Sequence, residues 1–488
     1  MGTHTTSSPH ARVPQQVAKG AIVAESLEKV RDRLYAKLLQ ERPKLKVYDD
    51  YFEGEQPLRF MSPLLKKELG DRITEIVVEF PQLAVEAYDN RLDIEGFRFA
   101  GADSSDEELW RIWQANEGDF ISQQGHQEHL ALSRAYALVG NNPDDENTPV
   151  ITVESAFDAI HEDDPASHQV KYGIKTWALE DRTRFINLYY EGGRVTWRRE
   201  RGEWIVDDED EDTFDLCRIT PLIHKPRMLG RHRPGRFDQR LGRSVFHSVI
   251  PLADAVNKMV TDMMVSAEFH AMPRRWAVGL DEKDFVDEET GQPLDTWEMI
   301  AGRIWASSNK DVTMGQFNEA DLTNFHSSVK LLAQLITQQL SLPPDYLGFG
   351  GQNPPSADAI RASERQMVKK AERMQQSLGT RWERVQRLVL LTQGKPDTDA
   401  AKQIETLWRD ASTPTVAQQT DATVKLVGAR VIPVQQARED LGYTKTQQDR
   451  MEDWDRQSSL SAVQAAVQAA SEQAATDAAA AAGDGSAA

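Results

Sequence analysis

The sequence predicts a mixed α+β fold that is mainly helical. Apolar residues recur at the three-to-four-residue spacing of helices over most of the chain, whereas residues 150–223 carry β-branched runs and turn signals. Two helical stretches, residues 244–270 and 319–340, flank a segment of short strands and turns, residues 273–318. This order predicts a helical hairpin with a small β insert at its tip, attached to a mixed α/β body.

The N-terminal part predicts a disordered arm followed by helices. Residues 1–20 are polar, and the segment Tyr48–Gly54 has the composition of a polar-aromatic turn. Pro81 marks either a kink in the helix expected at residues 71–92 or the start of that helix, because proline lacks the backbone N–H that a helix interior needs. The expected helices cover residues 21–41, 71–92, 106–115 and 118–139.

The β-rich stretch predicts several strands joined by turns. Gly192-Gly193 between two β-branched or aromatic runs is a hairpin signal. The acidic run Asp207–Asp212 lacks the spacing and the glycine of an EF-hand, so we expect a solvated loop. The expected strands are residues 150–153, 170–179, 184–190, 195–197 and 204–206.

Residues 224–243 form a basic segment rich in glycine and proline, which predicts a loop. Two interpretations remain open. The segment could present a ring of positive charge to nucleic-acid phosphates, or it could be a solvated loop that balances the acidic run. Its candidate phosphate-facing residues are Arg231, Arg233, Arg236, Arg240 and Arg243.

Each helix of the expected hairpin carries an apolar stripe. Pro251 either kinks the first helix or marks its true start. The stripe of the first helix includes Val249, Leu252, Val256, Val260 and Met263, and that of the second includes Phe325, Val329, Leu332 and Ile336.

A glycine- and proline-rich loop, Asp345–Pro355, connects the hairpin to the longest expected helix, residues 356–393. Ser356 is a good N-cap for that helix. The C-terminal part predicts a strand at residues 404–408 and helices at 415–428, 434–441 and 444–475, followed by a low-complexity tail.

Composition limits the possible functions. The net charge of −20 opposes tight DNA binding, which normally needs basic residues. It does not count against a conduit through which DNA must slide without sticking. The only cysteine, Cys217, rules out an intrachain disulfide, and we expect it to be a small buried residue. No apolar run is long enough for a bilayer, and the N-terminus has no signal-peptide pattern, so we expect no membrane association.

Motifs for catalysis or cofactor binding are weak. The chain has no Walker A motif and no Gly-x-Ser-x-Gly motif. His126 and His129, with Glu128 between them, lack the order of a zinc protease motif. We expect no enzyme activity, no cofactor and no metal site, although composition alone does not exclude the carboxylate pairs of a nuclease.

The order of these elements resembles siphophage portal proteins. Short strings that resemble the family occur in the family's order over residues 20–460, nearly the whole chain. They are Tyr51–Pro57, Asn90–Arg98, Gly242–Ser244 with Leu252–Lys258, Pro344–Gly351 with Asn353–Ile360, Trp408–Asp410 with Pro414, Lys425–Val427, Ile432-Pro433 and Leu441-Gly442.

The resemblance implies the portal fold, with regions named wing, stem, clip and crown. The implied regions are an arm (1–20), the wing (21–243), stem helix 1 (244–272), the clip (273–318), stem helix 2 (319–342), the tunnel loop (343–355), the long wing helix and return (356–412), the crown (413–475) and a tail (476–488). The stem stripes would then pack within and between subunits. The tunnel loop would face DNA through Tyr346, Phe349, Gly350, Gly351, Gln352 and Asn353.

The resemblance also implies a ring at one capsid vertex, typically of twelve copies, through which double-stranded DNA enters and leaves. The implied partners are other copies of the chain, the major capsid protein, the terminase large subunit and a head–tail adaptor. The implied location is the virion, after assembly in the host cytoplasm. Two alternatives remain: a packaging-linked nuclease, which would cut plasmid with a divalent metal, and another virion structural subunit.

Overall fold

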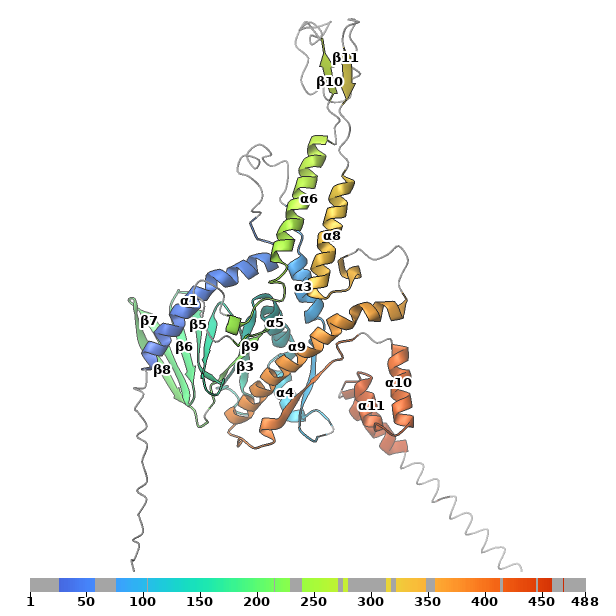
Figure 1. Ribbon diagram of the computed structural model, residues 1–488. Helices are drawn as coiled ribbons and strands as arrows, with labels where there is room; N and C mark the ends of the chain where they lie inside the picture. Colours follow the sequence, from blue (N-terminus) through green and yellow to red (C-terminus); the bar gives the residue numbers. More distant parts are fainter. Residues whose placement is uncertain are drawn as a thin grey trace, which may run out of the picture. The chain divides into compact units, whose positions relative to one another are not determined.

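The structure is a computed structural model that describes residues 26–57, 76–102, 104–214, 216–228, 239–270, 275–279, 313–316, 322–347, 356–412, 416–444, 446–458 and 468. The chain divides into two compact units. The first combines Met1–Gln40 with Ile160–Cys217, and the second combines Glu41–Ala159 with Arg218–Ala488. The described residues contain both helices and sheets, with helices the more abundant, which confirms the mixed, mainly helical class (Figure 1).

The first unit is built on a five-stranded sheet in the order β4-β5-β6-β7-β8. Its strands are β4 (Ala159–Asp163), β5 (Val170–Ala178), β6 (Arg184–Tyr190), β7 (Gly193–Glu200) and β8 (Glu203–Glu211). The predicted hairpin at Gly192-Gly193 is confirmed, because β6 and β7 pair antiparallel beside it and Gly192 has a φ of 102°. The N-terminal part of α1 (Leu27–Phe52) completes the unit, and its Arg31 guanidinium lies 5.0 Å from the centre of the Trp197 ring.

The acidic run is not the loop we expected, because most of it lies in β8. The strand is held by arginines of the neighbouring strand β7, which bring positive charge beside the carboxylates. Arg194 Nη2 lies 2.6 Å from Asp208 Oδ2, and Arg198 Nε lies 3.0 Å from Asp207 Oδ1.

The second unit contains the body, which we define as two small sheets and four helices. The sheets have the orders β3-β2-β9 and β1-β12. Helix α5 packs on the first sheet, and α9 contacts strands of both. The strands are β1 (Ile94–Phe99), β2 (Arg134–Gly140), β3 (Val150–Ser155), β9 (Ile219–Ile223) and β12 (Ile404–Trp408), and the helices are α3 (Phe80–Asp89), α4 (Glu107–Ala115), α5 (Gly118–Ala131) and α9 (Ala357–Thr392).

Large aromatic side chains form the centre of the body. Trp113 lies with its ring centre 5.1 Å from Phe97 on one side and 5.1 Å from Trp382 of α9 on the other, and all three are fully buried. Edge-to-face aromatic pairs of this kind add to the free energy gained by burying apolar area. The cluster therefore connects α4, β1 and the long helix α9.

Three predicted elements of the body were wrong in part. The helix expected at 118–139 ends at Ala131, and Ser133, with a φ of 79°, separates it from the buried strand β2. The helix expected at 71–92 begins only at Phe80, because Pro81 stands in its first turn; residues 76–79 are not helical. The turn expected at 48–54 is mostly helix, since α1 continues through Pro43 to Phe52.

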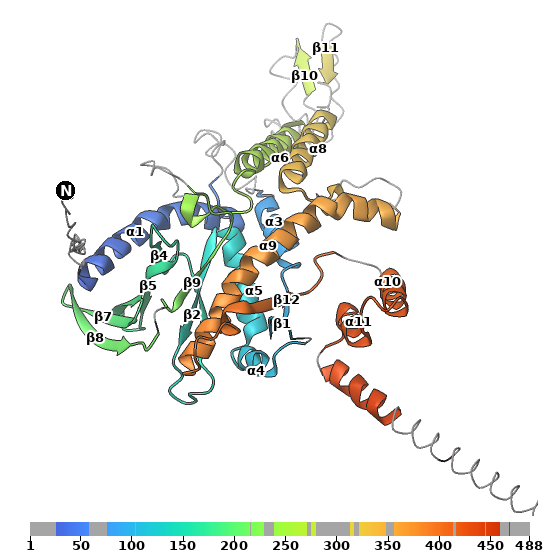
Figure 2. The same cartoon turned by 60° about the horizontal axis from the view of Figure 1, so that its bottom comes forward.

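The hairpin consists of α6 (Ile250–His270), β10 (Arg275–Val278), β11 (Thr313–Gln316) and α8 (Thr323–Leu340). Helices α6 and α8 lie side by side, and β10 pairs antiparallel with β11, so the predicted order of helix, strand, strand and helix is confirmed (Figures 1 and 2). Helix α6 starts at Ile250, so Pro251 marks its start rather than a kink.

Short helices follow the hairpin and the body. A 3-10 turn, η4 (Pro344–Leu347), precedes α9, and the side chain of Ser356 caps α9 by accepting from the backbone N–H of Ala359, as predicted. Beyond β12 lie α10 (Val416–Gly428), α11 (Val434–Asp440) and a helical stretch at 446–458. The expected arm, the tail and most of the expected clip lie outside the described residues.

Candidate functional site

The hairpin stripe is buried at one end and partly exposed along the rest. Val249 and Val256 at the start of α6 and Ile336 near the end of α8 are fully buried. The other stripe residues are partly exposed: Leu252, Val260, Met263, Phe325, Val329 and Leu332. Beside them on α8, Leu331 and Leu335 are exposed by 57% and 38%. A single copy of the chain thus leaves apolar surface on these helices uncovered.

Hydrogen bonds attach the buried end of the hairpin to its surroundings. Tyr51 of α1 donates to Asp254 Oδ1 at 2.5 Å, and the backbone N–H of Val78 donates to Asn257 Oδ1 at 2.9 Å. The hydroxyl of Tyr88 in α3 donates to the backbone oxygen of Leu340 at the end of α8. Both helices are therefore fixed at one end and supported by each other along their length.

The root of the predicted tunnel loop contacts the body through one arginine. Arg91 Nη2 donates to the hydroxyl of Tyr346 at 3.1 Å and to Glu364 Oε1 at 3.1 Å. Of the predicted loop residues only Tyr346 is described, and its hydroxyl faces Arg91. Phe349, Gly350, Gly351, Gln352 and Asn353 lie outside the described residues.

The two ends of the basic segment, His224 and Arg243, contact each other. The backbone N–H of Arg243 donates to the carbonyl of His224 at 3.1 Å, and His224 Nδ1 lies 2.7 Å from the carbonyl of Arg243. Arg240 is exposed and lies in the turn η2 (Gln239–Leu241), whereas Arg231, Arg233 and Arg236 lie outside the described residues.

Positive charges gather around this point. Burial lowers the pKa of Lys225, and Arg243 lowers it further. Burial also lowers the pKa of Lys370 in α9 to about 8, and Lys225 adds to that shift. The side chain of Lys370 donates to the carbonyl of Leu340 at 3.1 Å, so this positive region adjoins the end of α8. Such a region would attract an anion.

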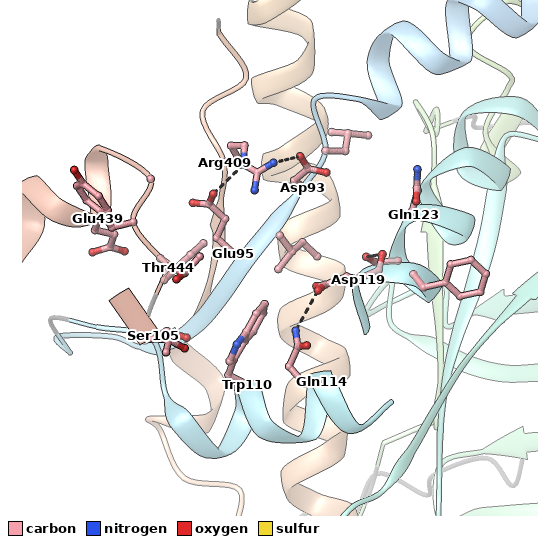
Figure 3. Close-up of a pocket in the computed structure, with 18 of the residues that line it drawn as sticks. Asp93, Glu95, Ser105, Trp110, Gln114, Asp119, Gln123, Arg409, Glu439 and Thr444 are labelled. Carbon is pink, nitrogen blue, oxygen red and sulfur yellow. Dashed lines mark hydrogen bonds and ion pairs between the residues drawn. The ribbon is translucent and has the colours of Figure 1, made fainter. Parts of the chain in front are cut away.

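A polar pocket of about 870 Å³ lies between the body and the residues that follow α11 (Figure 3). Arg409 bridges two carboxylates on its wall, at 2.8 Å from Asp93 Oδ2 and 3.0 Å from Glu95 Oε1. Burial, together with the nearby charge of Asp93, raises the pKa of Asp89 to about 7. Sequence reasoning missed this pocket, because its walls come from two segments far apart in the sequence, Asp89–His126 and Leu407–Gln448.

The histidines that we considered as metal ligands are core residues. His126 Nε2 accepts a hydrogen bond from the Trp382 indole at 2.9 Å, and His129 packs edge-on against His224. The described residues contain no group of three or more His, Cys, Asp or Glu side chains placed to hold a metal ion. Cys217 is fully buried, as expected. Over the same residues, no helix is both long and apolar enough to cross a bilayer.

An α/β body that carries a pair of striped helices separated by paired strands, followed by a long helix and a group of short ones, is the arrangement that the resemblance predicted for a portal-type structural subunit. The chain belongs to the phage portal protein family: the family described as "Phage portal protein, SPP1 Gp6-like" matches residues 31–462. Proteins of this family are structural components of the virion.

Two curated relatives carry the same assignment. The chain is 30% identical over 443 residues to the portal protein of Mycobacterium phage D29, with 88% of each chain covered. It is 30% identical over 423 residues to the portal protein of Mycobacterium phage L5, with 84% of each chain covered.

Solved structures with a similar fold include the neck of a native GTA particle computed with C12 symmetry. That chain is 14% identical, the match covers 80% of this chain and 91% of the other, and the TM-score is 0.43. The neck of an empty GTA particle computed with C6 symmetry is 13% identical, with 82% and 93% covered and a TM-score of 0.45. Family membership follows from the family match and the two curated relatives, and not from these structures.

Proposed function

We propose that copies of this chain close into a ring, with twelve copies as in typical tailed-phage portals, and that the ring forms the DNA channel at one capsid vertex. The observation that carries the proposal is the uncovered apolar stripe of α6 and α8. A helix pair with apolar residues on more than one side has surface to bury against a neighbouring copy as well as within itself.

The chemistry of the chain supports a passage and not a tight DNA-binding site. The net charge of −20 on each copy repels phosphates, so DNA would not adhere along the channel. Local contacts to DNA are assigned to the loop residues Tyr346, Phe349, Gly350, Gly351, Gln352 and Asn353. A ring of positive charge is assigned to Arg231, Arg233, Arg236, Arg240 and Arg243. Of these residues, Arg243 acts on the charge of Lys225, which in turn acts on that of Lys370.

We assign the predicted regions and partners to the ring on the same basis. The stem, residues 244–272 and 319–342, would line the channel. The ring would bind the terminase large subunit during packaging, the head–tail adaptor afterwards, and the major capsid protein at the vertex. The chain would assemble in the host cytoplasm and remain in the virion.

The oligomeric state of the purified protein tests this proposal. Light scattering after size-exclusion chromatography should give the mass of a large, discrete oligomer, and negative-stain images should show rings with a central hole. A stable monomer at micromolar concentration, or cleavage of plasmid by the protein with magnesium, would contradict the proposal.

A further inference from the structure

One buried guanidinium, that of Arg91, contacts residues on both sides of the glycine-rich segment, residues 348–355. Tyr346 lies in η4, just before residues 348–355, and Glu364 lies in the second turn of α9, just after them. Arg91 donates to both side chains, and it also donates through Nη1 to the backbone oxygen of Ala411. The segment that carries Arg91, η4, the start of α9 and the residues after β12 therefore meet at one side chain.

Burial makes these contacts costly to lose. The side chains of Arg91 and Glu364 are exposed by only 8% and 12%. A buried charge that loses its partner is strongly unfavourable, and the planar fork of arginine can reach acceptors in several directions at once. A lysine at position 91 would keep the charge but could not reach all three acceptors. The contacts are thus expected to form or break together.

The backbone that carries this guanidinium is itself fixed. Gln375 of α9 is buried, and its Nε2 donates to the carbonyl oxygen of Arg91 at 2.9 Å and to that of Arg409 at 2.9 Å. The long helix therefore holds the chain on both sides of the β1-β12 pair. Arg91 starts from a fixed point and reaches η4 and the residues after β12.

We propose that Arg91 is a positioning residue that sets where the glycine-rich segment begins and ends and couples that position to Ala411, which precedes α10. A displacement of Tyr346 is transmitted to Ala411 because both bind the same guanidinium. The coupling would let DNA contact at the loop alter the helices that follow β12. Only this last consequence rests on the proposed function; the coupling itself is a property of one chain.

Local proteolysis tests the first half of the proposal. Phe349 is a chymotrypsin site between Tyr346 and Glu364 in the sequence, and its cleavage rate reports how often the flanking contacts of Arg91 open. Arg91→Lys should raise the rate about tenfold, and the milder Tyr346→Phe should raise it about threefold, as expected for the loss of one hydrogen bond. Arg409→Lys is the matched control, because Arg409 also pairs with carboxylates but its side chain is 64% exposed. This control should leave the cleavage rate unchanged.

Hydrogen exchange tests the coupling. Tyr346→Phe should speed amide exchange at residues 410–412 and in α10, because Tyr346 and Ala411 both bind Arg91. Glu364→Gln, which keeps an acceptor oxygen, should retain most of the protection that Glu364→Met removes. A role limited to overall stability would instead change exchange throughout the body.

The proposal is wrong if Arg91→Lys leaves the cleavage rate at Phe349 unchanged, or if Tyr346→Phe leaves exchange at 410–412 and in α10 as in the wild type. Light scattering on the same samples separates this result from the ring. A monomer that still shows the coupling would refute the proposed function alone, whereas a ring without the coupling would refute only the role of Arg91.

Discussion

The body and the hairpin bury their apolar residues to very different degrees. In the body, Phe97, Trp113 and Trp382 pack against one another without exposure, and His126 donates and accepts only inside that core. In the hairpin, only the end near Val249, Val256 and Ile336 is buried to this extent. The body is packed as a closed core, whereas the hairpin leaves apolar side chains exposed, as the proposed ring requires.

This difference gives the two regions different roles in stability. A change in the aromatic core should affect the folding of every copy, whereas a change on the outer part of α8 should affect association and leave folding nearly intact. The predictions below are ordered by their expected effect on the free energy of unfolding.

The largest effect is expected for Trp382→Ala, which removes the side chain that joins α9 to Trp113 and His126. Large-to-small changes of a buried tryptophan cost about 3–5 kcal/mol. Urea unfolding followed by circular dichroism should show this loss. Trp454→Ala is the control, because Trp454 is 58% exposed, and the control should unfold like the wild type. Equal losses for the two variants would contradict the comparison.

Acid should weaken the body next. Burial lowers the pKa of His126 to about 3 and of His129 to about 4, and it holds the pKa of His224 well below its usual value. These histidines stay neutral when folded but gain protons when unfolded, so their stabilising contribution is present above pH 6.5 and is lost as the pH falls. Each histidine should lower the free energy of unfolding by about 1 kcal/mol when the pH falls one unit below 6.5.

Asp89 acts in the opposite direction. Its folded-state pKa of about 7 is above the unfolded value, so its contribution to stability is present at low pH and is lost as the pH rises toward 7. The net loss between pH 6.5 and 5.5 should therefore be about 2 kcal/mol, measured from urea midpoints. His129→Asn should reduce this net pH dependence by about half, and a midpoint that rises on acidification would contradict the assignment.

On the hairpin, changing Leu331 and Leu335 together to Asp should alter unfolding by no more than about 1 kcal/mol, since both side chains are already exposed. The same change should prevent ring formation, because it places charge in the surface that a neighbouring copy would cover. Light scattering measures the assembly. Leu179→Asp, at an exposed leucine of the first unit, is the control and should still assemble.

The smallest effect is expected for Asp262→Asn on α6. Asp262 pairs with Lys258 one turn earlier at 2.8 Å, and both side chains are more than 40% exposed. An exposed pair at this spacing contributes about 0.3–0.5 kcal/mol and is screened by salt. The difference from the wild type should disappear in 1 M NaCl, and a loss of several kcal/mol would show that the hairpin surface is less exposed than described.

The sequence predicted long periodic elements better than short buried ones. The helices of the hairpin and α9 were placed within a few residues, because their stripes run for several turns and Ser356 marks a cap. Strand β2 was taken for the end of a helix, since a strand buried on both faces is continuously apolar and has no alternation. Only the positive φ of Ser133 separates it from α5, and a serine in the sequence does not predict a positive φ.

The candidate site was predictable where it depends on a stripe and not where it depends on distant contacts. The buried and exposed parts of α6 and α8 share one pattern, so periodicity found the residues but could not show which were covered. Arg91 stood in a string that resembles the family, but its partners Tyr346, Glu364 and Ala411 lie more than 250 residues away. The buried Tyr48 and Tyr51 were assigned to a turn because their hydrogen-bond partners, His247 and Asp254, could not be foreseen.

The acidic strand β8 has a consequence for how copies can meet. It is the last strand of its sheet among the described residues, and five consecutive residues, Asp207–Glu211, are acidic. An outermost strand ordinarily invites another strand to add to it, which would lead to open-ended aggregates. Two such strands brought together would set like charges opposite each other along their length. Crowded copies would therefore not polymerise by pairing one β8 strand with another.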